Sequence, residues 1–153
     1  MGEILATGPM KVPGRITGDP VGAPPNVVHV SIKNPTAKDF EIQLFAEVCN
    51  STGPESIIPD TVQTVPSNSC LTRTLTFGTD VLPGDILRFF ARGDLDEDGE
   101  KLELSFVGQR TSDQMNEPTM FFRHSDLIES ENNSFLQDAL ASLTALSINP
   151  WGN

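Results

Sequence analysis

The acidic segment Asp94–Gly99 is the part of the chain whose residue types and spacing point most directly to chemistry. Alternate carboxylates on a short loop, followed by a glycine for a sharp turn, match the first half of a calcium-binding loop, where hard oxygens converge on the ion. The match stops at the twelfth position, where Ser105 replaces a bidentate glutamate and Glu100 or Glu103 would have to supply the oxygen. The alternative, which we favour, is an acidic hairpin tip that keeps a sheet edge soluble. The candidate calcium ligands are Asp94, Asp96 and Asp98.

The chain has two cysteines, Cys49 and Cys70, which the strand pattern places on the face opposite the apolar residues. A bond between them would close a loop of about twenty residues and stabilise the fold by about 3 kcal/mol. The alternatives are pairing between subunits and two free thiols in a reducing compartment. Free structural cysteines are usually buried, so we favour a disulfide, within the chain or between chains.

Catalytic signatures are missing from the sequence. The two histidines, His29 and His124, accompany no nucleophile elbow, zinc-protease motif, phosphate loop or dinucleotide fingerprint. His29 falls in the middle of a predicted strand on its polar face, which is typical of a surface histidine. We therefore do not expect an enzyme, and calcium is the one cofactor that the sequence suggests.

The elements that would position these residues are β-strands. Apolar and polar residues alternate from about Asn26 to Gln109, as in half-buried strands. Val28–Lys33 and Phe40–Cys49 flank turn residues and are predicted to form an antiparallel pair with one buried face. Roughly seven or eight short strands separated by turns predict an all-β chain, an antiparallel β-sandwich of jelly-roll or immunoglobulin-like type over residues 26–124. The further predicted strands are 57–65, 71–77, 86–91, 101–107 and 120–123.

Residues 1–25 are predicted to be an extended N-terminal arm, because glycine and proline recur too often for a long helix. An extended apolar segment is suited to adding to a sheet edge or filling a groove of a neighbouring subunit. The residues expected to mediate such assembly are Ile4, Leu5, Met10, Val12 and Ile16.

Residues 125–153 are predicted to be a C-terminal tail with a helix over about 135–147. Ser134 and Gln137 have the spacing of a capping box, and Pro150 lies just past the predicted end. The helix carries almost no charge, so it is expected to cover either its own sandwich or a neighbour. The tail residues assigned to assembly are Leu136, Leu140 and Leu143.

Composition narrows the partners of this 153-residue chain. A formal net charge of −11 disfavours nucleic acid and anionic membranes as partners, because both would repel the protein. It favours solubility and cation binding, and a merely solvated acidic surface is the more common alternative. No apolar run has the length of a membrane span, and the N-terminus lacks the basic start and apolar stretch of a secretory signal. We therefore expect a protein made in the cytosol that reaches any external location without a signal peptide.

The segments Asn26–Asn50 and Val62–Phe77, with the turn Val65–Cys70 between strands, resemble small β-sandwich proteins of bacterial spore surfaces and spore appendages. The resemblance implies assembly through extended N-terminal connectors and contacts between subunits. The N-terminal arm of this chain has no cysteine, so coupling through it would be non-covalent.

These observations together predict a structural subunit of a homo-oligomeric surface assembly or filament, located on a spore surface or virion and otherwise cytoplasmic. A calcium-dependent binding or adhesion module is the first alternative. A virion or phage decoration protein is the second.

Overall fold

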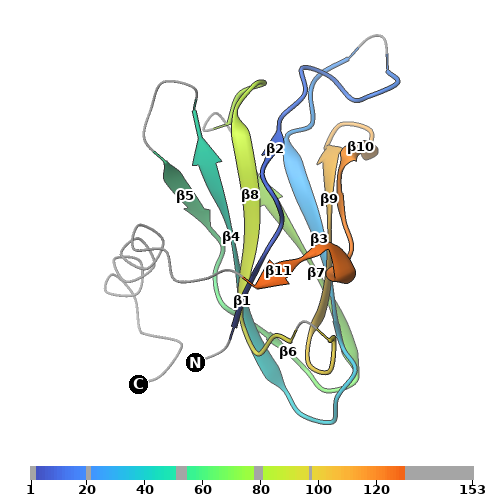
Figure 1. Ribbon diagram of the computed structural model, residues 1–153. Helices are drawn as coiled ribbons and strands as arrows, with labels where there is room; N and C mark the ends of the chain where they lie inside the picture. Colours follow the sequence, from blue (N-terminus) through green and yellow to red (C-terminus); the bar gives the residue numbers. More distant parts are fainter. Residues whose placement is uncertain (1–2, 20–21, 51–54, 78–80, 97, 130–153) are drawn as a thin grey trace.

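The computed structural model describes residues 3–19, 22–50, 55–77, 81–96 and 98–129, which form two antiparallel sheets packed face to face (Figure 1). The predicted all-β class is confirmed, and the two facing sheets are those of a β-sandwich. Among the described residues, no helix has the length and apolar character needed to cross a membrane.

The larger sheet has seven strands in the order β11-β1-β8-β4-β5, with β2 added to β8 and β6 added to β4. The smaller sheet has four strands in the order β10-β9-β3-β7. A single-turn 3₁₀ helix, η1 (His124–Asp126), connects β10 to β11. The strands are β1 (Glu3–Ala6), β2 (Met10–Lys11), β3 (Val27–Asn34), β4 (Phe40–Cys49), β5 (Ser56–Pro59), β6 (Gln63–Val65), β7 (Ser69–Thr76), β8 (Ile86–Gly93), β9 (Glu103–Arg110), β10 (Met115–Phe122) and β11 (Ile128–Glu129).

The main core lies between the two sheets, where alternate side chains of the longer strands β3, β4, β8 and β9 point inward. Phe89 on β8 is its central contact, because its ring stacks on Phe106 of the opposite sheet at 5.7 Å and on Phe77 at 6.4 Å between centroids. All three side chains are at most 3% exposed. Stacked aromatic pairs across the interface therefore fix how the sheets sit on each other.

A second apolar cluster lies on the opposite face of the larger sheet. Phe45 on β4 and Phe90 on β8 are cross-strand partners whose rings stack at 5.0 Å, and both are 0% exposed together with Ala6. Strict alternation along β4 predicts that Phe45 and Glu47 lie on its polar face, opposite Ile42 and Leu44. The structure differs, because Glu47 is only 3% exposed and Phe45 0%. The outer face of this sheet is thus buried around β1, β4 and β8.

The predicted pairing of the first two strands is wrong. β3 pairs with β7 and β9 in the smaller sheet, and β4 pairs with β5, β6 and β8 in the larger one. The connection between them crosses from sheet to sheet, and the buried Asn34 organises it by donating to the carbonyl oxygens of Lys38 at 2.7 Å and Val65 at 3.0 Å. Alternation reveals which side chains face the core but not which strand lies alongside, so either arrangement fits the same pattern.

The predicted N-terminal arm is also not separate from the sandwich. β1 and β2 pair antiparallel with β8 along the side that β4 leaves free. Between them, Thr7 continues the pairing, since its N–H donates to the Phe89 carbonyl at 2.9 Å and its hydroxyl accepts from the Phe89 N–H at 3.0 Å. The segment is extended, as expected, but the sheet edge that it completes belongs to its own chain. Four residues assigned to assembly are buried there: Leu5 (1% exposed), Met10 (9%), Val12 (3%) and Ile16 (1%).

The C-terminal boundary of the sandwich lies beyond the predicted residue 124. β10 begins at Met115 rather than at 120, and β11 pairs with β1, with Leu5 opposite Glu129 and Ala6 opposite Ile128. The predicted helix over 135–147, with its assembly residues Leu136, Leu140 and Leu143, lies outside the described residues.

Candidate functional site

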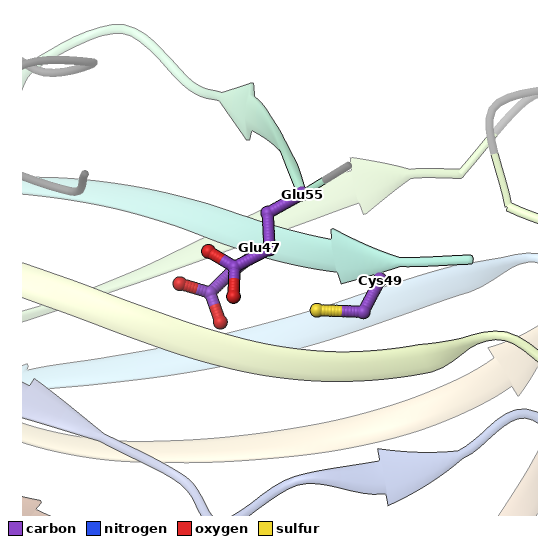
Figure 2. Close-up of side chains that lie close together, drawn as sticks. All are labelled: Glu47, Cys49 and Glu55. Atoms are coloured by element: carbon purple, nitrogen blue, oxygen red, sulfur yellow. The ribbon is translucent and has the colours of Figure 1, made fainter. Parts of the chain in front are cut away.

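Three side chains with metal-ligating atoms gather at the end of β4. Glu47 and Cys49 share the outer face of this strand, and Glu55 directly precedes the neighbouring strand β5, so the β4–β5 pairing brings it back to them. One carboxylate oxygen from each glutamate and the Cys49 sulfur all lie within 4.8 Å of one another (Figure 2). Among the described residues, these are the three histidine, cysteine or acidic side chains whose ligand atoms come close enough together to hold one metal ion.

Glu47 is an unusual member of this cluster because it is a buried carboxylate with an incomplete set of partners. One oxygen, Oε1, lies 3.7 Å from an Arg88 nitrogen, a long ion pair. The other, Oε2, is buried and has no hydrogen-bond partner. Arg88 also makes a cation–π contact, because its guanidinium carbon lies 4.7 Å above the centre of the Phe90 ring. A buried carboxylate oxygen without a partner is rare and calls for an explanation.

The electrostatics of the cluster favour uptake of a positive charge. Burial raises the pKa of Glu47, the charge of Glu55 raises it further, and Arg88 opposes the shift. The pKa of the Cys49 thiol is raised by burial and by the charges of Glu55 and Glu47. Both groups therefore hold their protons more tightly than usual, and a cation would release them.

The carboxylates of two of the three predicted calcium ligands already accept hydrogen bonds from the backbone. The Asp94 carboxylate accepts from the Glu41 N–H at 3.0 Å, and the Asp96 carboxylate accepts from the Asp98 N–H at 2.7 Å. These bonds tie the acidic loop to β4 and shape its turn. Calcium binding by Asp94, Asp96 and Asp98 stays a prediction.

The predicted disulfide within the chain is wrong, because Cys49 and Cys70 are both free. Cys49 ends β4 in the larger sheet and Cys70 lies in β7 of the smaller one. A bond within the chain would require neighbouring strands, whereas β4 and β7 belong to facing sheets about 10 Å apart, beyond the reach of two cysteine side chains. Pairing between chains remains open for the exposed Cys70.

Cys70 lines a groove of about 450 Å³ that crosses β7, β3 and β9. Most of its surface is apolar, with Ile32, Leu71 and Leu104 in the lining, and His124 is among the polar residues that line it. The Leu104 N–H donates to Nδ1 of His124 at 3.1 Å, so the ring proton is on Nε2, which donates to the Asp96 carbonyl at 2.8 Å. With both nitrogens engaged, His124 holds the acidic loop in place rather than acting as a base.

Two buried ionisable residues that the sequence analysis missed hold the N-terminal segment to the smaller sheet. The carboxylate of Glu117, a 0% exposed residue on β10, accepts from the N–H of Thr17 at 2.7 Å and from its hydroxyl at 2.9 Å. Arg110 on β9 bonds to Asp19 at 2.7 Å and to Asp113 at 2.6 Å. No local pattern in the sequence predicts either contact, because the partners are up to 100 residues apart.

Comparisons with known proteins add little. No family model matches the chain, and a search of curated proteins returns no match. A solved structure from Thermotoga maritima, designated 1070, aligns over 84% of this chain and 90% of its own at 7% identity, with a TM-score of 0.38. The Anabaena sensory rhodopsin transducer aligns over 69% of this chain and 87% of its own at 15% identity, with a TM-score of 0.36. Similarity this low supports no statement about function.

Proposed function

We propose that this chain is a structural, non-catalytic subunit, a sandwich of jelly-roll or immunoglobulin-like type, which associates with further copies of itself through β10 and β11. The observation that carries the proposal is where large apolar side chains are exposed. Of five such side chains in the described residues, three lie on these two strands: Met115 (42% exposed), Phe121 (48%) and Ile128 (56%). Single exposed apolar residues are ordinary, but their concentration on sheet edges is typical of an interaction site.

Both strands are sheet ends. β10 ends the smaller sheet and β11 ends the larger one, so within the described chain each pairs with a strand on one side only. η1 leads directly from one to the other, which places both edges on the same side of the sandwich (Figure 1). Unpaired peptide groups on an edge strand are a template for another chain. Antiparallel contact between the β10 strands of two copies would be self-complementary about a twofold axis.

Side-chain burial is expected to contribute more than a long hydrogen-bonded ladder. The pairing of β10 with β9 is interrupted by a bulge between Glu117 and Phe121, and a bulge bends its strand. Burying the exposed halves of Phe121 and Ile128 in both copies contributes roughly 3–6 kcal/mol. Association costs about 4–15 kcal/mol in lost freedom, so the contact is weak unless other groups add to it.

In this proposal, β10 and β11 mediate assembly in place of the N-terminal segment. Leu5 and Ile16 are each 1% exposed within their own sandwich, so offering them to a neighbour would mean opening its edge. A spore surface and a virion surface remain the two proposed settings for such a subunit.

Analytical ultracentrifugation from micromolar to millimolar concentration tests the proposal. We expect the mass to rise with concentration in the wild type and to rise much less in Phe121→Ser. Leu82→Ser is the matched control, because Leu82 is 61% exposed but lies in the turn before β8. A wild type that stays monomeric throughout, or two variants that lose association equally, would refute the proposed interface.

A further inference from the structure

The cluster at the end of β4 carries an inference that does not depend on self-association. We propose that Glu47, Cys49 and Glu55 form a binding site for a borderline divalent cation, Zn²⁺ foremost. The protein would supply one sulfur and two carboxylate oxygens, and a water molecule would complete a four-coordinate ion.

The geometry of the three side chains is close to what zinc requires. Zinc bonds of about 2.0–2.3 Å in a tetrahedron place ligand atoms about 3.3–3.8 Å apart. The corresponding atoms lie within 4.8 Å of one another, so a contraction of about 1 Å by side-chain rotation suffices. Glu55 is exposed and its carboxylate points toward that of Glu47 (Figure 2), so it is free to make this adjustment.

An independent observation points to a missing partner at this place. Glu47 is 3% exposed, and its buried Oε2 has no hydrogen-bond donor although a carboxylate oxygen accepts readily. Arg88 reaches only the other oxygen, and from 3.7 Å. A cation beside Oε2 would satisfy the one buried side-chain oxygen or nitrogen that the described residues leave without a partner.

The chemistry of the donors selects the ion. A thiolate is a soft ligand that magnesium and calcium avoid, whereas carboxylates are hard, and zinc accepts both. Binding converts the Cys49 thiol to a thiolate and releases its proton to solvent, and no electron is transferred. Two carboxylates, one thiolate, the Arg88 guanidinium and a doubly charged ion then sum to zero net charge.

Cys70 serves as an internal control for zinc binding by Cys49. Cys70 is exposed, and its partner across the strands of the smaller sheet is Lys33, whose ammonium repels a cation. A surface thiol that binds zinc adventitiously would therefore behave differently from Cys49, although both belong to one chain.

Titration with Zn²⁺ under reducing conditions, against a chromophoric chelator, tests the proposal, and Co²⁺ reports thiolate coordination through its charge-transfer absorption. We expect one ion per chain, more than about a tenfold loss of affinity in Cys49→Ser and in Glu47→Gln, and unchanged binding in Cys70→Ser. Circular dichroism of each variant confirms that it is folded.

Several results would overturn the site. They are no binding at micromolar Zn²⁺, binding by Cys49→Ser equal to the wild type, and loss of binding in Cys70→Ser, which would move the ion to the exposed thiol. Half an ion per chain would also overturn it, since the ion would then bridge two copies. None of these outcomes depends on whether the β10 edge associates, because Cys49 lies on β4.

Discussion

Glu117→Gln should destabilise the sandwich strongly, although it changes one atom and no volume. The carboxylate of Glu117 is fully buried and accepts hydrogen bonds from the N–H and hydroxyl of Thr17 and from the N–H and hydroxyl of Thr119. Three of the four bonds end on Oε2, and only the bond from the Thr17 N–H ends on Oε1. An amide oxygen in the place of Oε2 keeps its three bonds, and the N–H₂ group then faces the Thr17 N–H. The bond from the Thr17 N–H is lost, this donor faces another donor, and the three bonds that remain lose their charge assistance.

The magnitude follows from those contacts. Hydrogen bonds to a charged group contribute about 1.5–3 kcal/mol each, and a buried donor without a partner costs about 1–3 kcal/mol. Partial relaxation of Thr17 and Thr119 offsets some of this loss, so we expect a net cost of about 3 kcal/mol. In a domain of this length, that lowers Tm by about 6–12 °C.

The pH dependence gives a second signature. Burial raises the pKa of Glu117, but the hydrogen bonds from Thr119 and Thr17 outweigh it, and the pKa lies below the ordinary 4.5. A carboxyl with a lowered folded-state pKa contributes stability above its unfolded pKa and loses it as pH falls through the folded value. Wild-type stability should therefore drop below about pH 4.5. In Glu117→Gln this part of the drop should be missing.

Urea unfolding followed by far-ultraviolet circular dichroism measures both effects between pH 3 and pH 7. Glu100→Gln is the matched control, because Glu100 is exposed in the acidic loop and its change should stay within about 0.5 kcal/mol. A loss below about 1 kcal/mol in Glu117→Gln, or an acid limb identical to that of the wild type, would show that Thr17 is not held to β10 as described.

Two further substitutions test other parts of the sandwich. Glu47→Gln in metal-free protein should raise stability at pH 7 by about 1 kcal/mol, because it removes a charge that burial and Glu55 disfavour and that Arg88 offsets only from 3.7 Å. Because the pKa of Glu47 is raised in the folded state, the stability of the wild type should approach that of the variant as pH falls toward this pKa. A Tm of the variant at pH 7 equal to or below that of the wild type would contradict the reasoning. Asn34→Asp should cost about 2–3 kcal/mol at pH 7, because it turns a carboxylate oxygen toward the carbonyls of Lys38 and Val65. Denaturant melts measure this cost, and a neutral substitution would show that the connection between the sheets does not depend on Asn34.

Local patterns in the sequence predicted the strands well where one face is buried and the other wet. β3 and β9 are both recognisable from alternation, because over His29–Lys33 and Glu103–Phe106 their outer residues are polar and their inner ones apolar. β4 is recognisable as a strand, but the prediction that its outer face is exposed was wrong. Phe45 belongs to a second apolar cluster on that face and Glu47 is buried on the same face, which alternation between two faces cannot reveal.

The candidate metal site was not predictable from the same patterns. Glu47 and Cys49 are two residues apart in a strand, a spacing that occurs in most polar strand faces, and Glu55 follows after a turn. Only the pairing of β4 with β5 brings the third side chain to the other two. The acidic loop, by contrast, has the more conspicuous spacing, yet the carboxylates of Asp94 and Asp96 hold backbone amides.

The sequence by itself determined the class of the fold, because the period of the apolar residues, the turn residues and the extended proline-rich start are local properties of the chain. The tertiary structure decided which strands lie side by side and which distant polar groups meet. It also decided which sheet edge residues 3–12 pair with. Those choices depend on contacts between residues far apart in sequence, such as Thr17 with Glu117, and no local pattern encodes them. An extended apolar segment fits the edge of its own sheet and that of a neighbour equally well, and in this protein the free side of β8 is the one that it occupies.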